Sequence, residues 1–450
     1  MSNELKPLHF DADYTMEEAL AEAKRCLNCP KPLCRMGCPI ENEIPRFIQA
    51  IARGNFGEAN DILAERTNLP AICGRVCPRE NQCEGNCIMN KAKKPPINIG
   101  KLERFAADFE SINELRKPKK IKQDLGKVAV VGSGPAGLSV AGDVAKLGYE
   151  VTVFEGQSEP GGVLLFGIPE FRLSKAVVRR EIARLEGLGV KFVCNTFIGQ
   201  DKTLDDLFAE GFDSIFIGTG THIPQEVRME NDEVHGVFQA MYLLTNVQLV
   251  ENGELDEDQI PVKKGDRVII IGGGNVAMDA ARTCVRLGCE AVTVAYRRSQ
   301  EQMPALLSEY EEARAEGVQF QWFASPVGVE GKDKVEGFKY EVMALNEDGA
   351  GIHGTGNFQV MPVDKIIIAA GHKPNARLVG EGNNLKVDEK GYIITSEDPY
   401  GMTNRDGVFA GGDVVHKPAT VVLAMREAKK AVDGMVKYME IKKAQESANQ

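Results

Sequence analysis

The stretch GKVAVVGSGPAGLSVAGDVAKLGYEVTVFE, at Gly126–Glu155, has the order strand, glycine-rich turn, helix and second strand. The turn contains the motif G-x-G-x-x-G. The first glycine allows a tight turn, the second lets a pyrophosphate approach the backbone, and the third lets the helix pack on the strand. The phosphates would lie on free N–H groups at the start of the helix. We therefore predict a dinucleotide site that includes Gly132, Gly134, Pro135, Ala136 and Gly137.

The second strand of this unit ends at an acid, Glu155. A carboxylate at that place can accept hydrogen bonds from a ribose, which favours FAD over a nucleotide that carries a 2′-phosphate. The alternative is a glycine-rich turn without a ligand. The strand before the turn, the helix after it and the acid together favour the FAD interpretation.

The stretch RVIIIGGGNVAMDAARTCVRLGCEAVTVAYRRS, at Arg267–Ser299, repeats this plan. Its turn has the variant G-x-G-x-x-A, and its second strand ends in two arginines instead of an acid. Arginine can hold a 2′-phosphate through a charge-assisted fork, so we predict NADPH here. The alternative is that both arginines are surface charges and the nucleotide is NADH. The predicted NADPH residues are Gly272, Gly274, Asn275, Ala277, Arg297 and Arg298.

Other segments are typical of a flavoprotein of the disulfide-reductase type. FIGTG (Phe216–Gly220) and IAAGHKPN (Ile368–Asn375) are similar to the turns at which the chain of that fold crosses between domains. GVFAGGDV (Gly407–Val414) is similar to its second FAD segment. We expect Gly412 at the cofactor and Asp413 at the ribityl chain. A helix after Pro418 would direct its positive end at the flavin ring and favour the anionic reduced form.

The redox-active disulfide of such reductases is missing from the expected loop. GQSEPGGVLLFGIPEFRL, at Gly156–Leu173, contains no cysteine, although its Gly162 is a candidate for contact with the FAD. Cys284 and Cys289 do not form a C-x-x-C pair, and we interpret Cys284 as a small hydrophobic residue on its helix. Electrons that reach a flavin must therefore leave by another route.

Composition and charge limit the setting of the protein. The 450 residues carry a net charge of −11 and show no basic stripe, so nucleic acid is not expected as a partner. No apolar run approaches the ~18 to 20 residues of a membrane span. The start, Met1–Thr15, lacks the basic and apolar regions of a secretory signal. We expect a cytoplasmic protein with no membrane partner, in which clustered cysteines bind metal instead of forming disulfides.

Eight of the eleven cysteines lie before residue 90, in two groups of four. The spacings are C-x2-C-x4-C-x3-C and C-x3-C-x5-C-x3-C. Two such groups favour two [4Fe–4S] clusters, whose irons prefer thiolate. Zinc remains an alternative, although it is usually held by paired C-x2-C knuckles or Cys/His mixtures. A third alternative is that the cysteines are only structural. The groups are Cys26, Cys29, Cys34, Cys38 and Cys73, Cys77, Cys83, Cys87.

The region around these cysteines has helical patterns only. TMEEALAEAKRCL predicts a helix behind an N-cap at Thr15, and a small core could be completed by a bound cluster. The basic stretch Leu115–Gln123 reads as a linker. We expect an α/β protein with two Rossmann-like domains of the disulfide-reductase flavoprotein type behind an all-α iron–sulfur domain. The expected segments are 1–120 (iron–sulfur), 121–240 (FAD, first part), 241–375 (NADPH, inserted) and 376–450 (FAD, second part).

The chain resembles a known family along nearly its whole length. The cysteine block, PINIGKLERF (Pro96–Phe105), PGGVLLFGIPEFRL (Pro160–Leu173) and YRRSQEQMPA (Tyr296–Ala305) together resemble the small (beta) chain of NADPH-dependent glutamate synthase. The same module occurs in dihydropyrimidine dehydrogenase and in NADPH:ferredoxin transhydrogenase subunits. The length is similar to that of a short homotetrameric form described without a large chain.

The resemblance implies ligand sets that cross between the two cysteine runs, as in two-cluster ferredoxins. Cys73 is not a ligand in this scheme, and Glu103 is the fourth ligand of the second cluster. From the residues alone, Glu103 is a solvated helix residue, and Cys73 is the competing ligand. The implied sets are Cys26, Cys29, Cys34 and Cys87 for one cluster, and Cys38, Cys77, Cys83 and Glu103 for the other.

The resemblance also implies an activity. NADPH would reduce FAD by hydride transfer, and the clusters would carry single electrons to a site that makes glutamate from 2-oxoglutarate and glutamine or ammonia. That step needs position and electrostatics but no general acid or base, so we predict no catalytic residue. Ser2 follows Met1, where the large chain of the family has its nucleophilic cysteine. We therefore expect an electron-input chain whose partner is a large chain or further copies of itself.

Two other functions stay open. The same module could deliver electrons to another acceptor, as a ferredoxin transhydrogenase, a sulfide-type reductase or a pyrimidine reductase. Alternatively, the chain could be a zinc-stapled scaffold that holds nucleotides without catalysis.

Overall fold

The computed structural model describes residues 14–113, 121–347, 349, 351–375, 383–417 and 420–448. The chain forms two compact units. The larger unit contains the described residues of Asp11–Leu165, Arg172–Ile223 and Lys373–Gln450, and the smaller unit contains Phe166–Phe171 and Pro224–His372.

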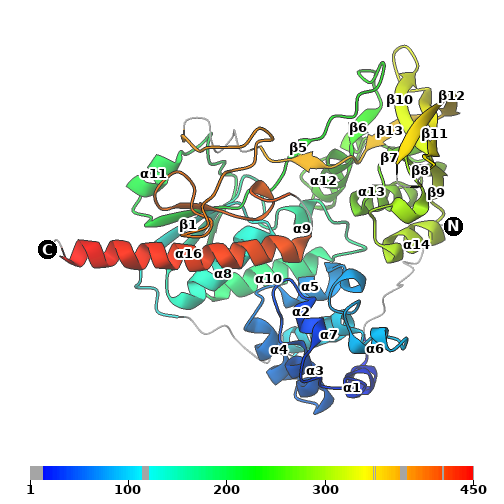
Figure 1. Ribbon diagram of the computed structural model, residues 1–450. Helices are drawn as coiled ribbons and strands as arrows, with labels where there is room; N and C mark the ends of the chain where they lie inside the picture. Colours follow the sequence, from blue (N-terminus) through cyan, green and yellow to red (C-terminus); the bar gives the residue numbers. More distant parts are fainter. Residues whose placement is uncertain are drawn as a thin grey trace. The chain divides into compact units, whose positions relative to one another are not determined.

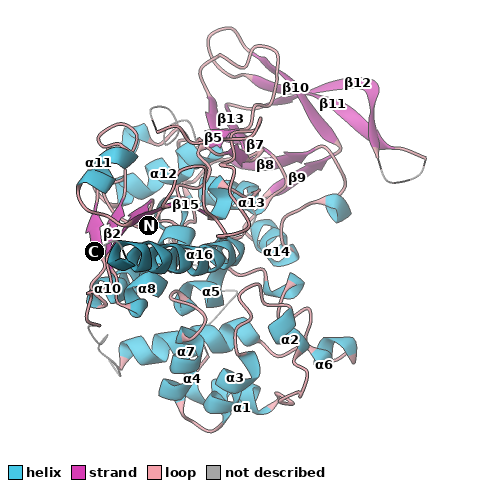
Figure 2. Ribbon diagram, turned by 60° about the vertical axis from the view of Figure 1, so that its left-hand side comes forward, coloured by secondary structure: helices cyan, strands magenta, loops and turns pink. Residues whose placement is uncertain are grey.

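The N-terminal helical region of the larger unit, residues 14–113, contains helices and no strand among its described residues (Figure 2). Its first helix begins at Thr15, whose side chain and that of Glu18 form a capping box, as the sequence predicts. Its apolar core includes Phe47, Ile51 and Leu102, together with Cys87. The helices are α1 (Met16–Lys24), α2 (Leu33–Met36), α3 (Ile44–Ala52), α4 (Phe56–Ala64), α5 (Pro70–Val76), α6 (Ile88–Lys91) and α7 (Ile99–Ile112).

The rest of the larger unit is built around a five-stranded parallel sheet, in the order β15-β4-β1-β2-β3. The strands are β1 (Lys127–Val131), β2 (Glu150–Phe154), β3 (Lys191–Val193), β4 (Ser214–Ile217) and β15 (Val408–Ala410). The helices are α8 (Pro135–Leu147), α9 (Val163–Phe166), α10 (Lys175–Gly187), α11 (Leu204–Ala209) and α16 (Val421–Ala448). α16 packs along α8 (Figure 1). Because β15 comes from the C-terminal part of the chain, this nucleotide-binding fold is assembled from two distant segments.

The smaller unit has a second five-stranded parallel sheet, in the order β6-β13-β7-β8-β9. Its strands are β6 (Val237–Gln239), β7 (Arg267–Ile271), β8 (Ala291–Tyr296), β9 (Gln319–Trp322) and β13 (Lys365–Ile368), and its helices are α12 (Ala240–Glu251), α13 (Asn275–Arg286) and α14 (Leu307–Ala315). A separate antiparallel sheet, absent from the sequence interpretation, consists of β10 (Ala324–Glu330), β11 (Gly337–Leu345) and β12 (Ile352–Pro362).

The chain passes between the units at two places that the sequence pattern indicates. It leaves the larger unit after Ile223, shortly after FIGTG, and returns at Lys373, inside IAAGHKPN. The short strands β5 (Ile223–Pro224) and β14 (His372–Lys373) form at these passages. The four expected segment boundaries stay predictions. Most of the expected linker and Pro418 lie outside the described residues.

Among the described helices, none combines the length and the apolar character that crossing a lipid bilayer requires.

Candidate functional site

The glycines of the first motif have three different environments. Gly132 has φ +93°, which favours glycine, and a Cβ on Gly137 would stand 1.9 Å from the carbonyl oxygen of Gly132. A Cβ on Gly134, in contrast, would meet no atom within 4 Å. The turn is therefore closed where the helix packs on it and open at the middle glycine, which fits the approach of a phosphate.

Two distant segments come to this turn. A Cβ on Gly162 would stand 2.9 Å from Gly134 Cα, and one on Gly412 would stand 2.8 Å from Ala136 Cβ. Both glycines have positive φ angles, of +52° and +75°. The structure thus brings the loop after β2 and the segment after β15 to the start of α8, where Pro135 is the first helical residue.

Glu155 lies directly after β2 and is 9% exposed. Its carboxylate accepts hydrogen bonds from the backbone N–H of Ser133 (3.0 Å) and of Gln157 (2.9 Å), and from the Ser133 hydroxyl. That hydroxyl accepts in turn from the backbone N–H of Gly161 (2.8 Å). Ser133 therefore fixes both the acid and the neighbouring loop. This role was not predicted from the sequence, although a serine inside the motif was the available signal.

Asp413 lies in the short turn after β15. Burial raises the pKa of its carboxyl to about 6. Within the described part of the chain, its side chain makes no hydrogen bond that would offset this burial. A half-buried carboxylate with free acceptor atoms fits the expected contact with a polyhydroxyl chain.

The second motif has the same division between closed and open positions. A Cβ on Gly272 would stand 2.4 Å from the Ala369 carbonyl oxygen, whereas one on Gly274 would meet no atom within 4 Å. Ala277, in the first turn of α13, is fully buried. Asn275 Oδ1 accepts a hydrogen bond from the backbone N–H of Leu306 (2.9 Å), so this side chain also holds a loop of the protein.

Arg297 and Arg298 follow directly on β8, and Arg297 is exposed. Neither guanidinium forms an ion pair with a carboxylate of the described residues. They are therefore available for a negatively charged group at the carboxyl end of this strand, where parallel α/β sheets bind their ligands.

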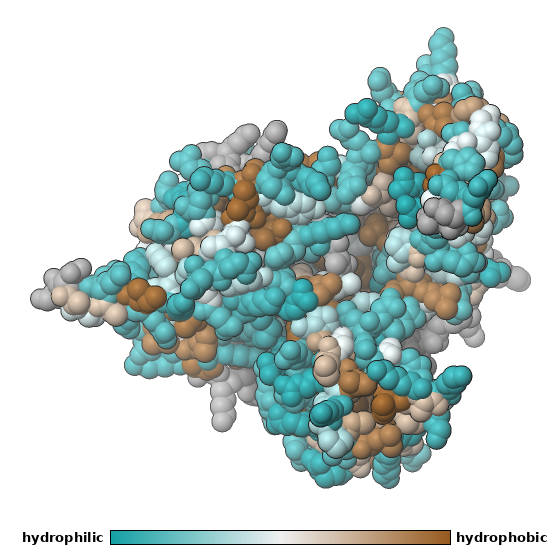
Figure 3. Space-filling view, in the orientation of Figure 1, coloured by the Kyte–Doolittle hydropathy of each residue, from teal (hydrophilic) through white to brown (hydrophobic). Residues whose placement is uncertain are grey.

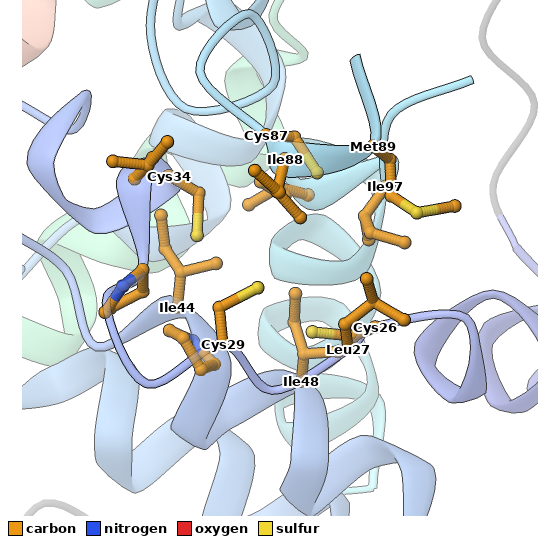
Figure 4. A pocket seen from close by; sticks show the side chains of 14 residues that line it. Cys26, Leu27, Cys29, Cys34, Ile44, Ile48, Cys87, Ile88, Met89 and Ile97 are labelled. Carbon is orange, nitrogen blue, oxygen red and sulfur yellow. The ribbon is translucent and has the colours of Figure 1, made fainter. Parts of the chain in front are cut away.

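Four cysteine side chains from both runs line one cavity, which we call cavity 1. Cys26, Cys29 and Cys34 come from the first run and Cys87 from the second, and their sulfurs face a common space (Figure 4). The other lining residues are apolar: Leu27, Pro32, Leu33, Ile44, Pro45, Ile48, Ile88, Met89, Ile97 and Ile99. The grouping follows the crossed set that the resemblance implies, and not the four consecutive cysteines of the first run.

A second cavity, cavity 2, contains the remaining donors. It is lined by Cys38, Cys73, Cys77, Cys83 and Glu103, together with Ile40, Asn42, Ile44, Arg79, Gln82, Ile99 and Val422. Five candidate donors thus meet where an iron–sulfur cube with four irons needs four. No group of three or more His, Cys, Asp or Glu in the described ranges is arranged to hold a metal ion. The fit to clusters therefore rests on donor chemistry and burial.

Burial disfavours the thiolate forms in both cavities. It raises the pKa of Cys34 to about 12 and that of Cys38 to about 11, and it raises the pKa of Cys83 well above its ordinary value. Thiolates crowded in an apolar cavity need positive charge to be stable, and iron supplies it. The donor set therefore fits iron–sulfur clusters.

Glu103 is 8% exposed, so it is not the solvated helix residue of the alternative interpretation. Its Oε1 accepts a hydrogen bond from Asn42 Nδ2 (3.3 Å), and burial raises its pKa to about 8, an effect that Arg79 partly opposes. Cys73 is 2% exposed, and its Sγ lies 3.8 Å from both Thr67 Oγ1 and Met425 Sδ. Both competing donors therefore stay candidates.

Cavity 2 shares a helix with the first nucleotide turn. Val422 at the start of α16 lines the cavity, and Ala424, two residues later, is the neighbour that a Cβ on Gly412 would meet at 3.7 Å. Both sites therefore lie against the first turn of α16.

The surface beside cavity 1 is apolar. Leu27, Met36 and Ile88 are 63%, 76% and 40% exposed, and Figure 3 shows hydrophobic surface over the N-terminal helical region. The first and last of these residues also line the cavity.

Two protein families match the chain. Residues 6–115 match the family described as dihydropyrimidine dehydrogenase domain II, 4Fe-4S cluster, and residues 126–428 match pyridine nucleotide-disulphide oxidoreductases. Among solved structures, FprA from Mycobacterium tuberculosis aligns with 72% of this chain and 86% of its own (TM-score 0.58, 20% identity). Thioredoxin reductase of T. acidophilum aligns with 70% of this chain and 97% of its own (TM-score 0.52, 20% identity). These likenesses confirm the expected fold.

Characterised relatives match along nearly their whole length. The glutamate synthase [NADPH] small chain of Escherichia coli K12 is 37% identical over 94% of this chain and 92% of its own. That of Azospirillum brasilense is 33% identical over 96% and 91%. The NAD-dependent dihydropyrimidine dehydrogenase subunit PreT of E. coli K12 is 34% identical over 95% and 96%. The chain is thus an oxidoreductase of the pyridine nucleotide-disulphide type with an N-terminal 4Fe-4S domain, and it belongs to the glutamate synthase small-chain family.

Proposed function

We propose that the chain is the electron-input component of an NADPH-dependent glutamate synthase. Two-electron reduction by NADPH would be converted at FAD into single electrons, which two [4Fe–4S] clusters would pass to the glutamate-forming site of a large chain. The observation that carries the proposal is the 37% identity to a glutamate synthase small chain across 92% of that protein.

The residues of the larger unit would bind and orient FAD. The open face of Gly134 and the N–H groups at the start of α8 would take its pyrophosphate. Glu155, already oriented by Ser133, accepts three hydrogen bonds and keeps about one lone-pair site, on Oε1, for a ribose hydroxyl. Asp413 would accept from the ribityl hydroxyls.

The residues of the smaller unit would select NADPH. Gly274 would take the pyrophosphate, and the two arginines after β8 would bind the 2′-phosphate. Arg297 and Arg298 carry no competing ion pair within the described residues, so their charge supports a preference for NADPH over NADH.

The N-terminal helical region would hold one cluster in each cavity. The proposed ligands are Cys26, Cys29, Cys34 and Cys87 in cavity 1, and Cys38, Cys77, Cys83 and Glu103 in cavity 2. Since cavity 2 shares α16 with the first nucleotide turn, its cluster would be the nearer one to the flavin.

A second candidate is the input subunit of a dihydropyrimidine dehydrogenase. It is favoured by the match of residues 6–115 and by the 34% identity to PreT. PreT is described as NAD-dependent, whereas this chain has two arginines after β8 that form no ion pair among the described residues and so support NADPH. Nucleotide preference therefore discriminates between the candidates.

The test is reconstitution of the anaerobically purified holoprotein with a glutamate synthase large chain from the same source. We expect oxidation of NADPH that requires both 2-oxoglutarate and glutamine, with glutamate as product. The comparison assays supply 2-oxoglutarate with ammonia and no large chain, a ferredoxin, or a dihydropyrimidine-forming subunit. A protein that reduces ferricyanide with NADPH but makes no glutamate with the large chain would contradict the proposal.

A further inference from the structure

Cys284 and Cys289 meet at the C-terminal end of α13. The backbone N–H of Cys289 donates to the Cys284 carbonyl (3.2 Å), and that of Gly288 donates to the Val285 carbonyl (3.0 Å). Gly288 has φ +84°. These are the two crossed hydrogen bonds and the left-handed residue of a Schellman motif. In that motif the side chains of the third-last helical residue and the second residue beyond the cap contact one another, and here both residues are cysteines.

The two thiols have different access to solvent. Cys284 is fully buried in the apolar core of the smaller unit, and Cys289 packs against the same core while remaining partly exposed. The Cys289 Sγ also lies 3.7 Å from the Lys263 carbonyl oxygen. The neighbouring Cys284 thiol lowers the pKa of Cys289. The same interaction, together with burial, raises the pKa of Cys284.

We propose that Cys284 and Cys289 form a redox-active dithiol, which closes to an intramolecular disulfide when it meets a low-molecular-weight disulfide. Neither residue lines the cysteine cavities or the glycine turns. The inference therefore does not depend on the proposed function.

The reaction balances with one co-reactant. The Cys289 thiolate attacks a sulfur of the small disulfide, so a mixed disulfide forms and one small thiolate leaves. Cys284 then loses its proton to solvent and attacks Cys289 Sγ, which releases the second small thiolate. The protein dithiol is oxidised by two electrons, and the small disulfide is reduced to two thiols.

Cys194 supplies an internal comparison. It is partly exposed, and burial is the largest cause that raises its pKa. It lies in the other unit and contacts no second thiol among the described residues. A mixed disulfide formed at Cys194 should therefore persist, whereas one at Cys289 should be resolved by Cys284.

Peptide mapping of the anaerobic holoprotein tests the proposal. The protein is treated with oxidised glutathione, alkylated, and digested with trypsin. Cleavage after Arg286 places Cys284 on Thr283–Arg286 and Cys289 on Leu287–Arg297, so a disulfide links two separate peptides. We expect the linked pair as the main oxidised form, lighter by two hydrogen atoms than the two reduced peptides together.

Two variants complete the test. In Cys284→Ser, we expect a lasting glutathione adduct on Cys289, because the resolving thiol is missing. In Cys289→Ser, which changes the more exposed residue, the buried Cys284 should stay reduced. Detection in the wild type of unlinked, fully alkylated Cys284 and Cys289, or of a glutathione adduct on Cys289 as lasting as that on Cys194, overturns the proposal. In that case Cys284 and Cys289 would serve only as the apolar side-chain contact of the Schellman motif.

Discussion

Asn42 donates a hydrogen bond from Nδ2 to Glu103 Oε1, at 3.3 Å, inside a cavity that four cysteines also line. The other amide atom, Asn42 Oδ1, is buried without a hydrogen-bond partner in the described structure. The carboxylate is thus held in place by a neighbour that follows shortly after Cys38, the last cysteine of the first run. This arrangement suits a ligand, because a fixed carboxylate loses little freedom when it binds iron.

Replacement of Glu103 should remove one cluster. We expect Glu103→Ala to lose about half of the iron and sulfide, since a cube with three remaining ligands is labile, and Cys73→Ser to keep both clusters. Iron and sulfide analysis with EPR of the reduced protein measures this. Glu110→Ala, a buried acid on the same helix, is the matched control and should keep its iron. The reverse result, with loss only in Cys73→Ser, would make Cys73 the ligand.

Substitution of the third and of the second glycine of the first motif should fail in different ways. Gly137→Ala places a Cβ 1.9 Å from the Gly132 carbonyl oxygen, so we expect poor folding and no FAD. Gly134→Ala adds a methyl group to open space, so the protein should fold but bind FAD at least about tenfold more weakly. Circular dichroism and flavin titration separate the two. Equal FAD affinity in Gly134→Ala and the wild type would mean that no phosphate approaches this turn.

Removal of both arginines after β8 should change nucleotide preference. We expect Arg297→Ala with Arg298→Ala to lower kcat/KM for NADPH by about 10- to 100-fold, the loss of one or two charge-assisted hydrogen bonds, and to leave NADH nearly unaffected. Steady-state reduction of ferricyanide measures both. Arg314→Ala, an exposed arginine on α14, is the control. A wild type that prefers NADH would exclude the NADPH assignment.

Glu181 should make stability depend on pH. Burial raises the pKa of this carboxyl to about 7, against partial compensation by Arg184 and Arg180. The folded state therefore holds a proton that the unfolded state releases near pH 4.5. The stabilisation by this proton is fully present below that pH. As the pH rises from there to about 7, the free energy of unfolding falls by on the order of 1 to 3 kcal/mol.

The measurement is the difference in Tm between the wild type and Glu181→Gln. The amide of the variant stays neutral at both pH values. The Tm of the wild type, relative to that of the variant, should therefore be lower at pH 7.5 than at pH 5. A difference that is constant with pH would show that Glu181 titrates normally.

Local sequence determined much of this molecule. The need for glycine at Gly132 was predictable because the backbone of the turn requires a positive φ there. The helix cap at Thr15 was predictable because its hydrogen bonds lie within a single turn. The two βαβ units were predictable for the same reason, because strand, turn and helix are contiguous. The cysteine count and the arginines at the end of β8 also indicate chemistry directly.

Other features depend on contacts that no local pattern encodes. Spacing alone grouped Cys38 with the first run, whereas the structure places it with Cys77 and brings Cys87 to the first cavity. The edge position of β15 and the approach of Gly162 to Gly134 also arise from long-range packing. Sequence by itself determined which turns could bind a nucleotide and that sulfur donors were available, since these are properties of short segments. Only the tertiary structure decided which donors share a cavity, because that choice is made by how distant helices pack against one another.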